Sequence, residues 1–232
     1  FPELPKIVSS VAQKSCLALL YELPSTKDIA ECNLTHLTHL LSDNSNKKFN
    51  REKAIQIREL ARKSIGLNSN SVSLELKQTI SIIRFIQEQL DDVEKRIKEI
   101  LKEINSPILT IPGISFKTAG SILAEIGDIS RFDSPAKLLA FAGLDPSMYQ
   151  SGKFFSTHSV MVKRGSKYLR FALMTAARMV CLNDVTFNEF KNKKMAEGKH
   201  YMVTMGHVAK KLVRVIYYLL KTNNVYQANK VA

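Results

Sequence analysis

Residues 74–104, LELKQTISIIRFIQEQLDDVEKRIKEILKEI, repeat apolar side chains at heptad spacing. The residues at the two repeating positions are Leu76, Ile83, Leu90, Ile97 and Ile104, with Ile86, Val93 and Ile100 between them. Because charged residues cover the other faces, the pattern predicts one long helix that forms a coiled-coil arm. Two partners for its apolar stripe stay open: the preceding helix in an intramolecular hairpin, or a second copy of the chain.

The residues before this arm predict short helices that form a linker region. Ser25 and Asn50 each stand where a helix N-cap is expected. His36 and His39 lie three positions apart, a spacing that could serve a metal, but no cysteine or carboxylate neighbour completes a site. We therefore expect exposed or capping histidines there.

After the arm, Pro107 ends the helix and residues 108–115, ILTIPGIS, precede another helical pattern over residues 117–127. This arrangement is typical of a helix-hairpin-helix. Gly113 tolerates positive φ and would let the backbone approach a ligand closely. The N–H groups of the turn, with Ser115 and Lys117, suit a DNA phosphate. The alternative is a plain helical turn inside a core.

The remaining pattern predicts a helix beginning at Ser134-Pro135, a polar loop over residues 147–153, and two amphipathic helices that close the chain. The second closing helix carries a stripe with 4-3-4-3 spacing, formed by His207, Lys211, Arg214, Tyr218 and Lys221. Such a basic stripe suits a nucleic-acid backbone, and solvated lysines around a core helix are the alternative. The expected fold is mainly α, with a helical linker (1–70), a coiled-coil arm (71–106) and a compact helical domain with the hairpin motif (107–232).

Charge is concentrated in the last third of the chain. The net charge is +13, and residues 151–232 contain 15 Lys and Arg against three acidic residues, so they account for +12. A basic face can be solvated surface, but an asymmetry this large favours a polyanionic partner.

The sequence also limits the cellular setting. Cys16, Cys32 and Cys181 lie far apart without a C-x-x-C pair, which favours neither a disulfide framework nor a zinc knuckle. No apolar run is long enough to span a membrane, and the start resembles neither a signal peptide nor an initiator methionine. We expect a cytoplasmic protein without a membrane partner, and a chain that begins within a longer gene.

The sequence contains few residues that are candidates for a catalytic role. The sequence contains no nucleophile elbow, Walker loop or H-E-x-x-H pair, and from residue 107 onward the acidic residues are spread singly. Ser151 stands beside Gly152, and five cations follow within twenty residues: Lys153, Lys163, Arg164, Lys167 and Arg170. These groups suit attack on a phosphodiester. From spacing alone four other serines compete, namely Ser147, Ser156, Ser159 and Ser166.

Several short motifs occur in one order along residues 108–221. They are Ile111-Pro112-Gly113-Ile114, Ile126-Gly127-Asp128, Arg131-Phe132, Leu138–Pro146, Ser151-Gly152, Lys163-Arg164-Gly165, Tyr168-Leu169-Arg170 and Ala209-Lys210-Lys211-Leu212. In this combination the chain resembles the DEDD transposases of the IS110 family, which includes Piv-type DNA invertases. Residues 1–105 resemble the linker and coiled coil between that family's two functional domains.

The resemblance implies a two-part recombinase. A RuvC-like domain would hold four acids and Mg²⁺, and the C-terminal domain would supply a serine nucleophile, a position on which Ser151 falls. The acids would lie before Phe1, so this chain would bind no cofactor and be inactive alone. The family loop often has Ser-Ser-Gly-Gly where this chain has Gln150-Ser151-Gly152-Lys153.

The partners implied are DNA, a structured guide RNA as in some relatives, and further copies of the chain in a dimer or tetramer, at the bacterial nucleoid. The expected DNA contacts are Gly113, Ser115, Lys117, Gly152, Lys153, Lys163, Arg164, Lys167, Arg170, Lys211 and Arg214. Two other interpretations stay open: a non-catalytic module for DNA binding and oligomerisation, and a structural coiled-coil adaptor for protein partners.

Overall fold

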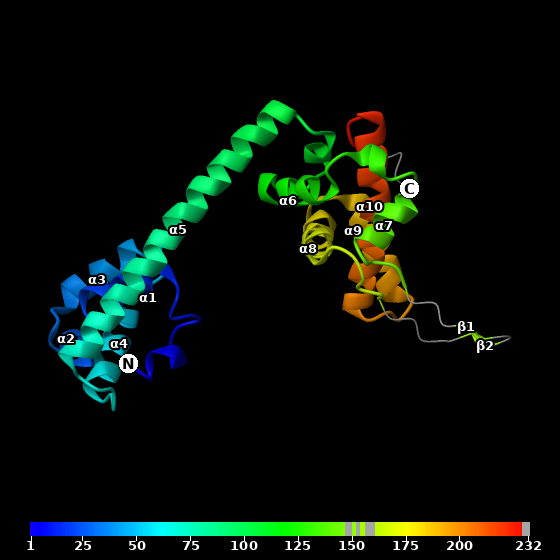
Figure 1. Ribbon diagram of the computed structural model, residues 1–232. Coiled ribbons are helices and arrows are strands. Elements are labelled where there is room, and N and C mark those ends of the chain that lie inside the picture. Colours follow the sequence, from blue (N-terminus) through cyan, green and yellow to red (C-terminus); the bar gives the residue numbers. More distant parts are fainter. Residues whose placement is uncertain (147–149, 152–153, 156–160, 229–232) are drawn as a thin grey trace. The chain divides into compact units, whose positions relative to one another are not determined.

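The computed structural model describes residues 1–146, the backbone of residues 150–151 and 154–155, and residues 161–228. The fold is mainly α, as predicted, and includes one helix of 35 residues (Figure 1). The chain divides into two compact units, Phe1–Asp91 and Asp92–Ala232. Each unit is built around a hydrophobic core of its own.

The first unit contains a short 3-10 helix, η1 (Leu4–Lys6), followed by α1 (Lys14–Glu22), α2 (Thr26–Glu31), α3 (Leu34–Asp43) and α4 (Arg51–Arg62). Ser25 forms a capping box with Asp28, and the side chain of Asn50 accepts from the backbone N–H of Lys53, so both predicted N-caps are confirmed. The core is aliphatic, with Leu19, Ile29 and Leu37 among its fully buried side chains.

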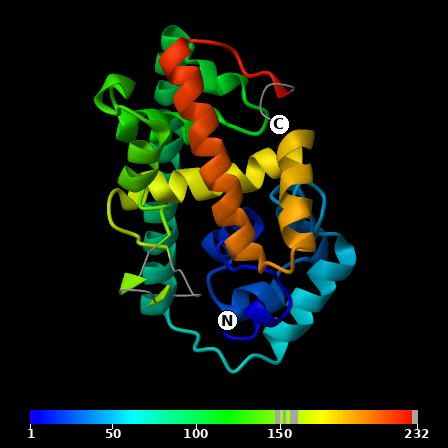
Figure 2. The ribbon, with the colours of Figure 1, turned by 90° about the vertical axis from the view of Figure 1, so that its right-hand side faces the viewer.

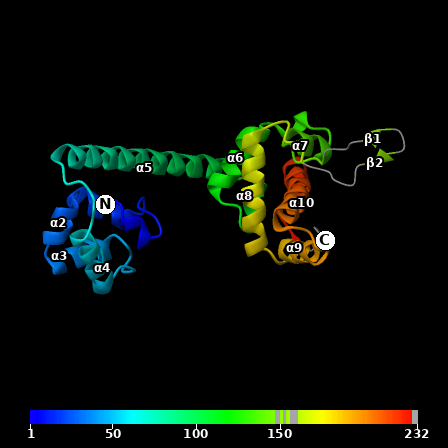
Figure 3. The same ribbon diagram turned by 90° about the horizontal axis from the view of Figure 1, so that it is seen from below.

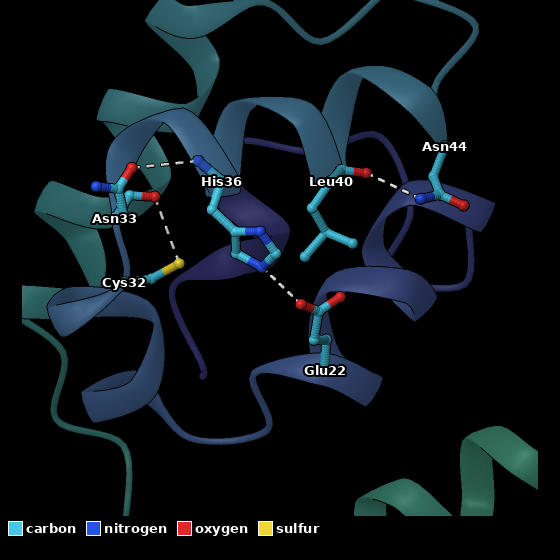
Figure 4. Close-up of polar contacts among 6 residues, drawn as sticks. All are labelled: Glu22, Cys32, Asn33, His36, Leu40 and Asn44. Carbon is cyan, nitrogen blue, oxygen red and sulfur yellow. Dashed lines mark hydrogen bonds and ion pairs between the residues drawn. The ribbon is translucent and has the colours of Figure 1, made fainter.

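The predicted role of His36 as an exposed histidine is also confirmed. Its Nε2 lies 2.6 Å from Oε1 of Glu22 at the end of α1, and the Asn33 side chain accepts from its backbone N–H to cap α3 (Figure 4). His39 is exposed as well. Both histidines are therefore exposed, and one of them pairs with a carboxylate.

The long helix α5 (Asn70–Ile104) begins four residues before the predicted start and ends at the predicted residue. The boundary between the two units falls within it, between Asp91 and Asp92. Leu101 is buried in the second core, whereas Leu90, Val93 and Ile104 at heptad positions are 53–58% exposed. The long helix is confirmed, and the coiled coil stays a prediction.

The second unit continues with η2 (Pro107–Thr110), α6 (Phe116–Ile126), η3 (Ile129–Arg131), α7 (Pro135–Phe141), β1 (Gln150–Ser151), β2 (Phe154–Phe155), α8 (Lys167–Asn183), α9 (Val185–Ala196) and α10 (Tyr201–Thr222). Helix α8 packs against α6, α9 and α10, and Figure 2 shows it crossing α10. Side chains of α6, α8 and α10 supply most of the core. Each of the four longer helices except α10 begins at a Ser or Asp whose side chain caps it.

The prediction of two closing helices was wrong, because α9 forms a third between them (Figure 3). Asp184 ends α8 and at once caps α9 by accepting from the backbone N–H of Phe187 at 3.0 Å. Phe187 is the only residue of α9 classed as buried. Because so few of its residues are buried, α9 lacks the regular spacing of apolar residues from which a helix is predicted.

Candidate functional site

Ser151 lies on strand β1, whose backbone pairs antiparallel with β2 so that Ser151 faces Phe154 and Gln150 faces Phe155. Gly152 and Lys153, together with the side chains of both strands, lie outside the described residues. The structure therefore locates the backbone of Ser151, and its role as nucleophile stays a prediction.

The chain segments that lead to and from this strand pair are fastened together. We call residues 143–146 and 161–166 the neck. The backbone N–H of Val162 donates to the carbonyl of Asp145 at 2.9 Å, and that of Lys163 donates to the carbonyl of Gly143 at 3.1 Å. Pro146 and Met161 form a further antiparallel bridge. These bonds fix where the chain leaves α7 and where it returns to α8.

Two glycines let the neck close. Gly143 and Gly165 have φ of +64° and +101°, a region that other residues rarely adopt. A Cβ on Gly143 would lie 2.1 Å from the carbonyl oxygen of Arg164, and one on Gly165 would lie 2.1 Å from that of Phe141. Each glycine therefore serves both a left-handed turn and a close approach of two backbones.

The side chains of Arg170 on α8 and of Ser166, which caps α8, hold the neck in place. Nη1 of Arg170 donates to the carbonyls of Lys163 at 3.1 Å and Ala142 at 3.3 Å. The hydroxyl of Ser166 donates to Oε2 of Glu125 at 2.5 Å and accepts from the backbone N–H of Leu169. Arg170, expected at DNA, thus has a structural role, because it joins the returning segment of the neck to the end of α7.

A groove of about 710 Å³ opens between the neck, α8 and the start of α10, and we call it the neck groove. Five cations line it: Lys163, Lys167, Arg170, Arg178 and Lys210. Its floor includes apolar side chains such as Phe171, which is 75% exposed. The structure thus brings together three of the predicted DNA contacts and adds Arg178 and Lys210, while Arg164 does not line the groove.

A second hollow of about 610 Å³ lies on the other side of α10, and we call it the α10 pocket. Its cations are Lys210, Lys211 and Arg214, and its aromatic residues are Phe190, Tyr218 and Tyr226. Four residues of the predicted stripe line this pocket, and Lys221 does not. Nζ of Lys211 lies 5.0 Å from the ring centroid of Phe190, a cation–π contact.

His207 and Lys210 line both hollows. Burial lowers the pKa of His207 below its usual value, and the nearby charges of Lys210, Lys199 and Lys194 lower it further. Burial also lowers the pKa of Lys210. The imidazole between the two hollows is therefore mainly neutral at pH 7.

The residues expected at the hairpin turn lie apart from both hollows. Gly113 has a φ of +92°, as its sequence context suggested, but a Cβ there would lie 2.6 Å from the carbonyl oxygen of Met179. Its close approach is thus made to the backbone of α8. Ser115 caps α6 by accepting from Thr118, and Lys117 pairs with Glu94. Their contact with DNA stays a prediction.

Comparisons with known proteins match the part of the chain that contains the neck and Ser151. Residues 105–193 match the model described as the transposase IS116/IS110/IS902 family. The chain is similar to that family over this range, and we refer to the matched residues as the transposase-family domain. It spans α6 to most of α9, including the neck and Ser151, whereas α10 lies beyond the matched range.

Curated relatives agree with this assignment. The chain is 30% identical over 151 residues to the pilin gene-inverting protein of Moraxella bovis, covering 62% of this chain and 47% of that protein. It is 29% identical over 151 residues to the transposase for insertion sequence element IS1328 of Yersinia enterocolitica, with 61% and 44% covered. An IS110 insertion-element protein of 43.6 kDa from Streptomyces coelicolor is 26% identical over 164 residues, with 69% and 40% covered. The chain thus matches less than half the length of these relatives.

Tyr226 lies in the tail, the segment of residues 223–228 that follows α10, and it joins this tail to the transposase-family domain. The sequence did not predict its contacts. The hydroxyl of Tyr226 donates to Oδ2 of the buried Asp184 at 2.9 Å, and its ring stacks on Phe187 with centroids 6.5 Å apart. Its backbone N–H donates to Oγ1 of Thr110. Burial and the Asp184 hydrogen bond raise the pKa of Tyr226. The only signal in the sequence is an Asp that could cap a helix, and nothing there pairs it with a tyrosine 42 positions later.

Two further properties concern the described residues only. Within this part of the chain His, Cys, Asp and Glu nowhere gather in threes that could bind a metal ion. None of the described helices has both the length and the apolar character of a membrane span.

Proposed function

We propose that this chain is part of a DNA transposase or recombinase in which Ser151 attacks a DNA phosphodiester. The observation that carries the proposal is that the transposase-family domain contains the strand with Ser151. The neck on either side of this strand pair borders a groove that five cations line. Relatives named as transposases and as a gene-inverting protein act on DNA by their names, which supports DNA as the substrate.

The reaction is a transfer of the phosphoryl group between oxygens. The bond from Oγ of Ser151 to phosphorus forms, one P–O ester bond to the sugar breaks, and the sugar oxygen leaves and takes a proton. The hydroxyl proton of Ser151 passes to a base. Because the phosphoserine ester conserves the energy of the broken ester, the reverse step can join the phosphate to a different strand.

Residues of the neck groove would offset the negative charge that grows on the phosphate oxygens in the transition state. Lys163 belongs to the neck itself, and Lys167 begins α8 immediately after it. Arg170 already donates to the carbonyls of Lys163 in the neck and of Ala142 just before it, so it acts chiefly by holding the neck in place. Positioning of this kind contributes to rate because the nucleophile is presented at a fixed site.

The metal and the second half of the active site are also part of the proposal. The described acidic residues of this chain do not form a group suited to Mg²⁺. As the resemblance implies, we propose that a RuvC-like domain of the whole protein holds Mg²⁺, where it would stabilise the charge on the phosphate. This chain alone is then inactive.

Partners follow from the same surfaces. DNA is the primary partner, and a structured guide RNA is a second polyanion that the +12 charge of residues 151–232 would also attract. The exposed heptad positions of α5 favour assembly through a coiled coil between copies of the chain. A dimer or tetramer would supply the several active sites that strand exchange needs.

The second candidate is a non-catalytic module for DNA binding and oligomerisation. It is favoured by the two cationic hollows and the exposed apolar stripe of α5, none of which requires Ser151. Both candidates predict salt-sensitive DNA binding, so a binding measurement alone does not separate them.

Trapping of a covalent protein–DNA adduct separates them. The complete gene product is incubated with end-labelled substrate DNA, and adducts are resolved under denaturing conditions. We expect an adduct with the wild type and with Ser147→Ala, a matched serine of the same segment, and none with Ser151→Ala. An adduct of wild-type yield from Ser151→Ala, or recombination at the wild-type rate, would refute the assignment.

A further inference from the structure

The α10 pocket has features that a binding site for duplex backbone alone does not need. A phosphate backbone requires cations, yet three aromatic residues line this hollow: Phe190 of α9, Tyr218 of α10 and Tyr226 of the tail. Its volume of about 610 Å³ is within the usual range for sites that enclose small organic groups. A ligand that fills it should therefore have a flat apolar part beside its charge.

The aromatic residues are held by different means. The ring of Tyr226 is fixed by its stack on Phe187 and its hydrogen bond to Asp184. Phe190 is half-buried and contacts Lys211 and Lys194. Tyr218 is 52% exposed on the face of α10 that lines the pocket, so its ring is accessible to a ligand.

The cations of the pocket have little anionic compensation. None of the ion pairs found among the described residues involves Lys210, Lys211 or Arg214. The pKa of Lys211 is lowered by burial, an effect that Asp184 only partly opposes. A partly desolvated ammonium group gains most from an anionic ligand that replaces its lost hydration.

We propose that the α10 pocket holds one unpaired nucleotide of a nucleic-acid strand, with its base against Tyr218 and Phe190 and its phosphate on Lys211 and Arg214. This inference rests on the proposed function, because it refines how that nucleic-acid surface is used. In a duplex the face of a base is covered by its neighbours, so an aromatic pocket is useful only for a base that has left the stack.

The position of the pocket favours a strand over a free nucleotide. His207 and Lys210 line both the α10 pocket and the neck groove, so cations continue from one hollow to the other. A strand with one base in the pocket can therefore continue along the neck groove. A mononucleotide would use only the first of these surfaces.

Fluorescence anisotropy of the complete protein with labelled oligonucleotides tests this inference at one fixed salt concentration. The probes are a single strand, a blunt duplex of the same sequence, and that duplex with one unpaired nucleotide, each prepared as DNA and as RNA. We expect Tyr218→Ala to weaken binding of the single strand and the bulged duplex about tenfold, and of the blunt duplex less than about twofold.

Matched variants separate the pocket from general effects. Tyr201→Ala removes a tyrosine that is 43% exposed on α10 and lines neither hollow, and it should leave all affinities unchanged. Tyr218→Phe keeps the stacking ring and should keep the wild-type affinity. Lys211→Gln should act like Tyr218→Ala, whereas Lys221→Gln, outside the pocket, should not.

The outcomes distinguish the two proposals. If the wild-type protein binds none of the probes, the proposed function fails. If it binds them and neither Tyr218→Ala nor Lys211→Gln changes the preference for unpaired nucleotides, only the pocket is refuted. Competition by a free mononucleotide as strong as that by the single strand would also overturn the inference.

Discussion

The neck groove and the α10 pocket share His207 and Lys210. The neck that borders the groove is nevertheless built in a different way from the pocket. The neck is made of backbone contacts: paired carbonyls and N–H groups, two glycines with positive φ, and an arginine that donates to two carbonyls. The α10 pocket is made of side chains from α9, α10 and the tail that follows α10. Backbone contacts resist displacement, whereas side chains on a helix can be exchanged without moving the chain.

The rigid neck and the side-chain pocket suit two different tasks, which are positioning a nucleophile and binding nucleic acid. A nucleophile needs a fixed position to within a fraction of an ångström, and the neck fixes the described segments on either side of the strand pair that carries Ser151, the proposed nucleophile. Affinity needs cations and rings but tolerates small shifts. The match to the transposase family ends at residue 193, so it contains the neck but none of the three cations of the α10 pocket. We therefore expect neck substitutions to affect folding and chemistry, and α10 substitutions to affect binding.

The largest effect is expected from a methyl group placed in the neck. Gly165→Ala forces a Cβ to within 2.1 Å of the carbonyl oxygen of Phe141 at a φ of +101°, and should destabilise the protein by about 2–5 kcal/mol. Gly198→Ala is the matched control, because Gly198 also has positive φ but its Cβ would meet nothing within 4 Å. The control should lose only about 1–2 kcal/mol.

Chemical denaturation of both variants measures this contrast. Equal losses of stability for Gly165→Ala and Gly198→Ala would show that the close backbone approach contributes nothing, and the description of a rigid neck would fail. A recombination assay should show that Gly198→Ala remains active.

Two arginines that line the same groove provide a second contrast. Arg170→Gln removes the charged donor that joins Lys163 and Ala142, and should lower stability by about 1–3 kcal/mol. Arg178→Gln should leave the melting temperature nearly unchanged and reduce the slope of log affinity against log salt by about one unit. If the two variants had the same effect on stability, Arg170 would be only another surface cation.

The hydrogen bond between Tyr226 of the tail and Asp184 provides a third test. Tyr226→Phe leaves Oδ2 of the buried Asp184 without this donor, which should cost about 1–2 kcal/mol at neutral pH. Because the pKa of Tyr226 is raised, the folded protein keeps the phenol proton where the unfolded chain loses it. The contribution of Tyr226 to stability is therefore present below pH 10 and declines as the pH rises above it.

Denaturation of the wild type and Tyr226→Phe across pH 8 to 11 checks this dependence. The difference in unfolding free energy between them should narrow above pH 10. A difference that stays constant over that range would mean that the Asp184 hydrogen bond does not set the ionisation of Tyr226.

What could be predicted from sequence is mostly local. Ser25 and Asn50 were identifiable as N-caps because a cap bonds to backbone within three residues, and the long helix was identifiable because its heptads repeat. The neck was not predictable because its bonds join backbone groups of residues 143–145 to those of residues 162–163, and backbone groups leave no side-chain pattern. The pairing of Tyr226 with Asp184 depends on how α8, α9 and the tail pack. The mainly α fold and the concentration of charge could therefore be predicted, whereas the division into two hollows could not.

The smallest expected effect concerns His207, which lies where the two hollows meet. Its pKa is lowered by burial and by Lys210 on its own helix, and by Lys199 and Lys194, while Glu197 opposes these. Lys194 and Lys199 themselves hold the pKa of Glu197 at about 2, so that carboxylate stays ionised across the range tested. As the pH falls from 7.5 to 5.5, the protonated fraction of His207 grows and adds positive charge to both hollows. Nucleic-acid affinity should then rise about two- to fivefold.

His207→Gln should flatten this pH profile, whereas His200→Gln, at an exposed histidine that lines neither hollow, should not change it. Protonation also opposes folding, since the lowered pKa means that the unfolded chain takes up the proton first, so stability contributed by the neutral ring is lost as the pH falls below about 6.5. Binding and stability should thus move in opposite directions with pH in the wild type. If both fell together on acidification, His207 would be a core residue that contacts no strand, and the two hollows would not form one continuous surface.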